Sequence, residues 1–306
     1  VRADGTQAAV ASSAAADDDD DGDEALERKL AVFNAWVASR GFPVNKLRAV
    51  HAPGMRAGAV AAADISAEDV YLSVPLHSVM DLHTSRRSAM GPTLRRVDAK
   101  TGGRSDPFHE LLFFLVNETF GHDRAHSEWK PYLDLLPKPR DMDHPAYYTA
   151  EEVALLRGSA IALKLKEYQD SIGRKYRGVQ GFLMDPDDPI MDPAVFTAEH
   201  YKWAHVVLDS RAIWWGGERH LVPLLDLINC GQGPDPARVH KTELDGAGKN
   251  ALTKAPWAFA RGAQVLENYG QPNHVYFQFH GFSLAENAHD CVMVVLDLQE
   301  FVGHRT

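Results

Sequence analysis

Two groups of reactive side chains suggest familiar chemistries, but neither pattern is complete. His122 and His126 lie four positions apart, so they could share one face of a helix and bind zinc. The sequence contains no His-Glu-x-x-His pattern and no third ligand at a typical spacing. Gly281-Phe-Ser-Leu-Ala285 partly matches the turn that exposes a nucleophilic serine in hydrolases, but it ends in Ala and lacks the strand-to-helix context. We therefore expect neither a metal site nor a serine nucleophile.

Acidic and glycine-containing segments are no more informative. Asp185-Pro-Asp-Asp-Pro189 is acidic like a calcium-binding loop, but its prolines and the missing central glycine prevent the required turn. We expect a surface loop there. No Gly-x-x-x-x-Gly-Lys pattern occurs, so a phosphate-binding P-loop is not predicted. These short motifs indicate only a soluble α+β protein.

Longer patterns say more because several of them occur together in one order. The chain contains Trp129-Lys-Pro-Tyr-Leu-Asp-Leu-Leu-Pro137, Leu221-Val-Pro-Leu-Leu-Asp-Leu-Ile-Asn229 and Arg261-Gly-Ala-Gln-Val-Leu-Glu-Asn-Tyr-Gly270. They are accompanied by Gly58-Ala-Val-Ala-Ala-Ala-Asp-Ile65, Val70-Tyr-Leu-Ser-Val-Pro75, Phe196-Thr-Ala-Glu-His-Tyr-Lys-Trp203, and Gly281-Phe282 with His289-Asp290. In this order the patterns resemble the SET-domain methyltransferases of the Rubisco large-subunit lysine methyltransferase and actin-histidine methyltransferase group. The resemblance spans about Ala31 to Leu298.

The resemblance implies an α+β fold: a β-rich SET domain interrupted by a helical insertion. The segments around Asn229 and Tyr269 would meet in a threaded, pseudoknot-like active site, one of the exceptions to unknotted chain connectivity. S-adenosylmethionine (SAM) would bind on one face, and the acceptor side chain would enter through a narrow channel from the other. We therefore expect a SAM-dependent protein-lysine methyltransferase whose partner is a protein substrate.

The implied reaction needs few reactive side chains. Methyl transfer is an in-line displacement by a neutral amine, so alignment and desolvation should supply most of the acceleration. A lysine with a reference pKa of about 10.4 must first lose its proton, which burial in an apolar channel promotes. By resemblance Tyr269 is the catalytic residue, and its hydroxyl would orient the amine and polarise the methyl group. The alternative is a core tyrosine that is hydrogen-bonded to the backbone.

The same resemblance assigns the residues that hold SAM. Asn229 matches the first residue of an Asn-His pair that holds the amino-acid end of the cofactor, and Asp226 would support this segment. Arg211 matches a cofactor-contacting position where a guanidinium can pair with the SAM carboxylate. A turn-forming asparagine and a solvated arginine at a helix end are the alternatives.

A second part of the cofactor site falls near the start of the SET-like region. Gly58 corresponds to a glycine loop near SAM, where the missing Cβ would permit close backbone approach. The flanking candidates are Ala59 and Val60 and, on a following strand, Asp69, Val70 and Tyr71. Tyr71 could instead be a core residue.

The chain also departs from the family pattern. Cys230 replaces the histidine of the Asn-His pair, and a thiol cannot reproduce the hydrogen bonding of an imidazole. Arg56 replaces the first glycine of Gly-x-Gly, and Tyr269-Gly-Gln-Pro-Asn273 is one residue short. Val275 stands where the family commonly has an acidic residue, and His280 stands where it commonly has a tyrosine. These departures leave two alternatives open: a SET-like protein-binding module with weak or lost catalysis, and a protein-histidine methyltransferase.

The hydrophobic period predicts the elements that position these residues. Asp23 could cap a first helix that places Leu26, Leu30, Phe33 and Val37 on one face. Further helices are predicted from Asp106-Pro107 to Gly121, from Thr149 past Tyr168, and from Thr197 to Arg211. Short apolar runs predict strands at Leu47–His51, Gly58–Ala62, Val70–Val74, Leu221–Leu225, Ala251–Lys254, Val265–Asn268 and Cys291–Leu298.

These changes of period divide the chain into five segments. We expect a disordered acidic tail at 1–24, the first part of the SET domain at 25–86, the helical insertion at 87–212, the second part of the SET domain at 213–285, and the start of a truncated C-terminal region at 286–306. The first residue is Val1, and the following Ala- and Ser-rich stretch could be the remnant of a transit peptide.

Composition limits the partners and the compartment. Of the net charge of -10, residues 1–25 carry -7 through eight acidic residues and one basic residue, which leaves -3 for the rest. The sequence contains no block of Lys and Arg of the kind that binds a nucleic-acid backbone. The longest clearly apolar run, Leu111–Val116, is too short to cross a bilayer. Two cysteines indicate a reducing, intracellular compartment, with plastid and cytoplasm or nucleus equally open. We expect no nucleic acid and no membrane partner, and of the oligomeric states a monomer is favoured.

Overall fold

The computed structural model describes residues 20–292, in which a run of helices separates two groups of strands. The first part contains α1 (Asp20–Ser39), β1 (Val44–Asn45), β2 (Leu47–Ala52), β3 (Arg56–Ala61) and β4 (Val70–Pro75). The helical part contains α2 (Leu82–Arg87), α3 (Gly91–Lys100), α4 (Pro107–Phe120), α5 (Lys130–Leu133), α6 (Ala150–Leu155), α7 (Ala160–Leu183) and α8 (Ala198–Arg211). The last part contains β5 (Ile213–Trp215), β6 (Glu218–His220), β7 (Asn229–Cys230), β8 (Thr242–Leu244), β9 (Asn250–Lys254), β10 (Gln264–Glu267) and α9 (Asn273–Val275), which continues into a π-helical turn at Tyr276–His280.

Strands from both ends of the described chain combine into the same sheets. One sheet has the order β1-β4-β9-β8 and a second has the order β2-β3-β10-β7, while β5 and β6 form a separate hairpin. The pairings are antiparallel except that of β10 with β7, which is parallel. The helical stretch thus interrupts an α+β fold whose strands come from both sides of it.

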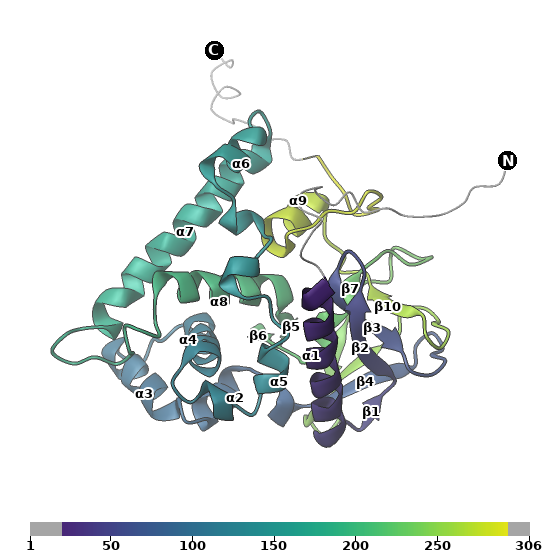
Figure 1. Ribbon diagram of the computed structural model, residues 1–306, viewed down its shortest axis with the longest axis horizontal. Helices are drawn as coiled ribbons and strands as arrows, with labels where there is room; N and C mark the ends of the chain where they lie inside the picture. Colours follow the sequence, from purple (N-terminus) through teal and green to yellow (C-terminus); the bar gives the residue numbers. More distant parts are fainter. Residues whose placement is uncertain (1–19, 293–306) are drawn as a thin grey trace, which may run out of the picture.

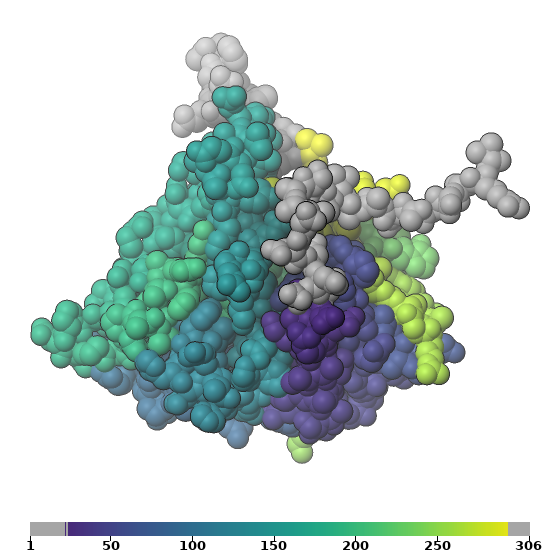
Figure 2. All heavy atoms as spheres, viewed as in Figure 1, coloured from purple at the N-terminus to yellow at the C-terminus, as the bar shows by residue number. Residues whose placement is uncertain are grey.

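Helices cover one side of the molecule and strands the other. Figure 1 shows β2, β3, β4 and β10 grouped on the right, with α2, α3, α4, α7 and α8 on the left. Helix α1 lies between the two groups, as the dark purple surface in Figure 2 shows. Its predicted apolar face is confirmed, since Leu26, Leu30, Phe33 and Val37 are all buried. The core is therefore continuous from the strands through α1 to the helices.

Most predicted elements are confirmed where local sequence signals are strong. Helix α4 has Asp106 as its N-cap, with a side chain that accepts from the backbone N–H of Phe108, and ends at Gly121. Helix α8 begins after Thr197, which caps it through the N–H of His200. Such side-chain caps satisfy backbone donors that have no partner within the helix.

Four expectations about elements need correction or fall outside the described residues. Helix α1 begins at Asp20, so Asp23 lies within the helix and is not its N-cap as predicted. The helix after Thr149 is two helices, and Gly158, with φ +93°, lies between them. Leu221–Leu225 is not a strand: Leu221 forms one bridge to Met80, and Leu224 has φ +76°. Of the predicted strand Cys291–Leu298, residues 293–298 lie outside the described residues.

The division into five segments remains a prediction. Helix α2 crosses the expected boundary at 86/87, while α8 ends one residue before the boundary at 212/213. Among residues 20–292, no helix is both long and apolar enough to span a membrane. In the same range no group of three His, Cys, Asp or Glu side chains is arranged for a metal ion, and His122 instead contacts Asp192.

Candidate active site

The parallel pair of β7 and β10 brings two distant parts of the chain together. Asn229 pairs with Leu266, and Cys230 pairs with Glu267. Just beyond β10, the Tyr269 hydroxyl donates to the carbonyl oxygen of Ile228 at 2.5 Å. The structure thus places Tyr269 against the residue directly before Asn229, as the resemblance implied.

Contacts on either side hold this crossing in place. The backbone N–H of His240 donates to the carbonyl oxygen of Asn268 at 2.6 Å, and the Asn268 side chain donates to Pro236 O at 2.9 Å. Gln232 donates to the side chain of Asn287 at 2.8 Å. The loop after β7 is therefore fixed both to the end of β10 and to the later segment around residue 287.

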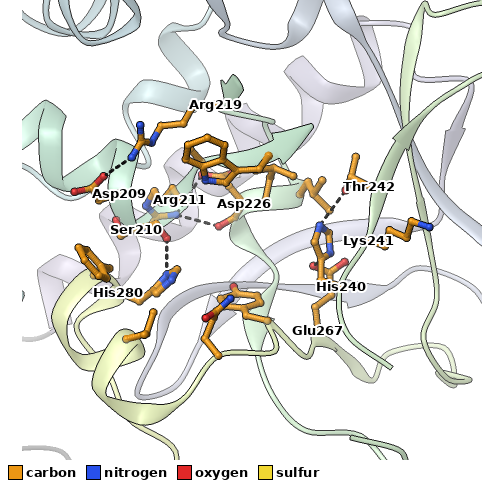
Figure 3. A pocket seen from close by; sticks show the side chains of 18 residues that line it. Asp209, Ser210, Arg211, Arg219, Asp226, His240, Lys241, Thr242, Glu267 and His280 are labelled. Atoms are coloured by element: carbon orange, nitrogen blue, oxygen red, sulfur yellow. Dashed lines mark hydrogen bonds and ion pairs between the residues drawn. The ribbon is translucent and has the colours of Figure 1, made fainter. Parts of the chain in front are cut away.

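Tyr269 lies at the wall of a cavity of about 530 Å³. This volume lies within the usual range for pockets that bind small molecules or single side chains. The wall combines charged and aromatic groups, several of which Figure 3 shows directed toward one another. The lining residues are Asp209, Ser210, Arg211, Ala212, Ile213, Trp214, Arg219, Leu225, Asp226, His240, Lys241, Thr242, Glu267, Tyr269, Gln271, Val275, Phe279 and His280.

Tyr269 is surrounded by aromatic rings and remains a neutral hydroxyl. Its ring centroid lies 5.7 Å from that of His280, 6.3 Å from Tyr276 and 6.4 Å from Phe282. Burial raises the pKa of Tyr269 well above its ordinary value, and the nearby Cys230 and Glu267 raise it further. The hydroxyl therefore stays protonated and donates its hydrogen bond to Ile228 O.

Arg211 and Asp226 form an ion pair at the same cavity. Arg211 Nη1 lies 3.1 Å from the Asp226 backbone oxygen and 3.3 Å from its Oδ2, and the Tyr132 hydroxyl donates to that Oδ2 at 2.8 Å. Burial raises the pKa of Asp226, and the contacts with Arg211 and Tyr132 offset this increase only in part. Asp226 Oδ1 is buried and has no hydrogen-bond partner. Arg211 is thus a fixed side chain of the site, in contrast to the alternative of a solvated residue.

Asn229 and Gly58 meet where β3 approaches β7. Asn229 Nδ2 donates to the carbonyl oxygen of Ala57 at 3.0 Å. A Cβ added to Gly58 would lie 2.8 Å from this Nδ2 and 3.0 Å from Gln264 Nε2. The bare glycine backbone therefore lies directly against the Asn229 amide, and any side chain at position 58 would displace it.

The remaining predicted residues lie around this centre at different depths. Cys230 is buried, and so is Ala59 on β3, whereas Val60 of the same strand pairs with Gln264. Asp69 accepts from Lys46 Nζ at 2.8 Å and, like Val70, contributes nothing to the cavity wall. The structure thus brings Tyr269, Arg211 and Asp226 to one cavity and joins Asn229 and Gly58 beside it.

Tyr71 reaches the site through a residue that the motif analysis did not select. Its hydroxyl donates to Glu267 Oε1, and Glu267 in turn lies beside His240. Glu267 is the last residue of β10 and lies two positions before Tyr269 within the Arg261–Gly270 motif. No such signal existed for His240, because its contact with Glu267 depends on the fold.

The structure shows how Arg56 is accommodated where the family pattern has a glycine. It has φ +62°, a conformation that glycine adopts easily, and its guanidinium donates to the Leu135 carbonyl oxygen at 2.5 Å. The side chain thereby contacts the segment around residue 135. Burial lowers the pKa of Arg56, and the nearby Arg211 lowers it further. The contact between Gly58 and Asn229 is present together with this larger residue.

Comparison with solved structures identifies the architecture. The SET domain of LSMT bound to lysine and AdoHcy superposes with a TM-score of 0.69 at 24% identity, over 84% of this chain and 57% of that chain. The fold is that of a SET domain. A structure of Rubisco LSMT bound to AdoMet matches with a TM-score of 0.68 at 23% identity and the same coverage. The expected α+β SET fold interrupted by a helical insertion is confirmed.

Sequence comparison places the SET domain among related proteins. SET domain-containing protein 4 of Mus musculus is 24% identical over 290 residues, which is 90% of this chain and 63% of the mouse protein. The chloroplastic [fructose-bisphosphate aldolase]-lysine N-methyltransferase of Arabidopsis thaliana is 28% identical over 225 residues, covering 69% of this chain and 42% of that protein. Human actin-histidine N-methyltransferase is 27% identical over 278 residues, covering 87% and 44%.

The predicted relationship to both methyltransferase types is therefore confirmed. No family model matches the SET-domain chain. The chain spans only about half of the length of these relatives, between 42% and 63%.

Proposed function

We propose that this SET domain is a SAM-dependent protein methyltransferase that acts on a lysine side chain. The observation that carries the proposal is the contact of the Tyr269 hydroxyl with Ile228 O, at the wall of a 530 Å³ cavity and beside Asn229. The two segments that the family uses for donor and acceptor are adjacent here. The relatives' names refer to protein substrates, which supports a protein as acceptor.

The residues around β3 and β7 fit a SAM molecule. The bare backbone of Gly58 packs directly against the Asn229 amide, and Arg211 offers a guanidinium at the cavity wall. We assign Asn229, Arg211 and the loop at Gly58 to the cofactor, with Asp226 holding Arg211 in place. When bound, SAM supplies an electrophilic methyl group on a sulfonium.

The acceptor side of the reaction depends on alignment. Tyr269 holds its hydroxyl toward the Ile228 carbonyl, so two polar atoms of fixed position can orient an amine at the cavity wall. The rings of Tyr276 and Phe282 pack around Tyr269, and an apolar environment of this kind favours the neutral, nucleophilic form of an amine. Positioning of this kind can supply most of the rate of a displacement reaction.

Transfer of a labelled methyl group tests the proposal. The purified chain is incubated with methyl-labelled SAM and a protein extract, and the modified residues are identified by mass spectrometry. Methyl-lysine in the acceptor is the expected result. Methyl-histidine would establish the alternative acceptor, which the likeness to actin-histidine N-methyltransferase keeps open.

Calorimetry with SAM separates the enzyme from a non-catalytic binding module. Cys230 stands where the family has histidine, and it is a small buried thiol whose pKa is raised by burial. Saturable heat on SAM addition is expected, because Asn229, Arg211 and Gly58 remain in place. The absence of both heat and transfer would favour the protein-binding module.

The location is a proposal of the same kind. Cys230 and Cys291 are both free thiols, and Cys291 is exposed. An exposed thiol persists in a reducing compartment, so we propose an intracellular protein and leave plastid and cytoplasm or nucleus open. Fractionation with immunodetection of the native protein measures this directly.

A further inference from the structure

A second group of polar side chains lines the cavity, separate from the Arg211–Asp226 ion pair. It consists of Thr242, His240 and Glu267, which the fold collects from β8, the loop before it and β10. Figure 3 shows His240 between Glu267 and Thr242 at the side of the cavity. None of these three side chains has a role in the methyl-transfer mechanism proposed above.

The geometry of the group is that of a carboxylate, an imidazole and a hydroxyl in series. His240 Nδ1 lies 2.5 Å from Glu267 Oε2, and His240 Nε2 lies 2.9 Å from Thr242 Oγ1. The contact with Glu267 has the distance of an ion pair but not the alignment of a hydrogen bond. With the proton of a neutral ring on Nδ1, beside the carboxylate, Nε2 presents its lone pair toward the hydroxyl. A base oriented by a third group in this way is poised to accept a proton.

Burial makes the arrangement rigid. Only 2% of the Glu267 side chain is exposed, against 15% for His240, so the imidazole is the more accessible of these two cavity-lining side chains. The second carboxylate oxygen of Glu267 accepts from the Tyr71 hydroxyl. Burial raises the pKa of Tyr71 well above its ordinary value, and the adjacent Glu267 raises it further, so Tyr71 is a permanent donor.

The proposed reaction requires a proton acceptor at this cavity. A lysine enters as an ammonium, and it becomes nucleophilic only after one N–H bond breaks and its electron pair stays on nitrogen. We propose that His240 takes this proton through the Thr242 hydroxyl and that Glu267 is the positioning residue that holds the imidazole ring. This inference rests on the proposed methyltransferase function.

The proton balance is complete within these side chains. The ammonium gives a proton to Thr242 Oγ1 while the hydroxyl proton moves to His240 Nε2. The amine keeps the electron pair that forms the bond to the methyl carbon. The resulting imidazolium is stabilised by the Glu267 carboxylate and later releases its proton to solvent through its exposed edge.

The pKa of His240 moves in the direction that the relay needs. Burial lowers the pKa of His240, but the charge and contact of Glu267 outweigh it, so the pKa lies above 6.5. Tyr71 contacts Glu267 without lining the cavity. The other charged and titratable side chains of the cavity wall are Asp209, Arg211, Arg219, Asp226, Lys241, Tyr269 and His280. Below its pKa, His240 is already protonated and cannot accept another proton.

The pH dependence of kcat tests the relay. Transfer from labelled SAM to poly-L-lysine, or to extract protein where the polymer is inert, is followed from about pH 5.5 to 9.5. The wild-type kcat should fall as the pH drops through a midpoint above 6.5. In E267Q this midpoint should move to lower pH, because burial then acts on the imidazolium without a carboxylate to oppose it.

Variants of His240 and Thr242 complete the test. H240Q should remove the acidic limb and lower kcat by about 10²- to 10⁴-fold. T242V should slow the reaction, and T242S, which restores the hydroxyl, should recover it. Each variant should bind SAM with wild-type affinity by calorimetry, and H126Q, an exposed histidine outside the cavity, is the matched control.

Two outcomes would overturn the relay without affecting the methyltransferase proposal. One is an active H240Q enzyme whose kcat and pH midpoint equal those of the wild type. The other comes from NMR titration of the His240 ring and needs no turnover: an unchanged pKa in E267Q would show that the pair does not exist in solution. A wild-type protein that transfers no methyl group to any acceptor would instead refute the proposed function.

Discussion

The hydroxyl of Tyr269 lies 2.5 Å from the carbonyl oxygen of Ile228, a residue 41 positions earlier in the chain. The contact joins the two segments that the parallel pairing of β7 and β10 brings side by side. It also fixes the direction of a hydroxyl that is buried enough to stay neutral. Tyr269 is therefore positioned by the same crossing that positions Asn229.

Replacement of Tyr269 by phenylalanine tests the role of this hydroxyl. Y269F keeps the ring and its aromatic contacts but loses the polar atom, so methyl transfer should fall by about 10²- to 10³-fold. SAM affinity, measured by calorimetry, should change little. Tyr176→Phe, a tyrosine on α7 outside the cavity, serves as the control. Equal transfer rates in Y269F and wild type would remove Tyr269 from the mechanism.

Substitution of Gly58 should weaken the cofactor site by steric means. In G58A the new Cβ would lie 2.8 Å from Asn229 Nδ2, so the amide must move away from Ala57 O. We expect about 1–3 kcal/mol less stability from this overpacking, together with weaker SAM binding. Gly246 has open space around it, so G246A is the matched control. Calorimetry and urea unfolding measure both effects, and wild-type SAM affinity in G58A would contradict the assignment.

The Arg211–Asp226 pair should show strong coupling between its members. Asp226 is fully buried while Arg211 is partly exposed, so R211M leaves a buried carboxylate with reduced compensation. Breaking a buried pair in this way costs about 3–5 kcal/mol. The double variant R211M/D226N should recover part of this loss, because it removes the uncompensated charge. Urea unfolding of the two single variants and the double variant measures the coupling, and strictly additive effects would show that the pair is unimportant.

His144 should make stability depend on pH from a position next to Phe279 and His280, which line the cavity. Burial lowers the pKa of His144 from 6.5 to about 4. Between these values the unfolded chain binds a proton that the folded chain does not, so stability is lost as the pH falls from 6.5 toward 4. The full difference corresponds to about 3 kcal/mol.

The measurement compares the free energy of unfolding at neutral and acidic pH. H144Q should flatten the dependence in this window, since glutamine does not titrate. The exposed residue His126 provides a control, and H126Q should leave the slope unchanged. An identical slope in H144Q and wild type would show that His144 is protonated in the folded protein at its ordinary pKa.

Several elements followed directly from the sequence because their signals are local. Asp106 and Gly121 bound α4, and Thr197 caps α8, since a cap depends on residues within one helical turn. The boundary between α6 and α7 did not follow, because Gly158 can be helical or left-handed and only the surrounding structure selects φ +93°. The same holds for Leu224. Its apolar neighbours predict a strand, but in the folded chain Leu224 has a positive φ of +76°.

The sequence alone therefore determined the SET-type order of strands, helical insertion and strands. It also indicated Tyr269 and Asn229, because the motifs that contain them can be recognised without knowing the fold. Only the tertiary structure decided that Arg211 and Asp226 share a cavity with Tyr269, and that His240 lies against Glu267. The physical reason is sequence separation: side chains far apart in the chain meet only after β7 and β10 have paired. A contact of this kind has no periodicity or cap from which it could be read beforehand.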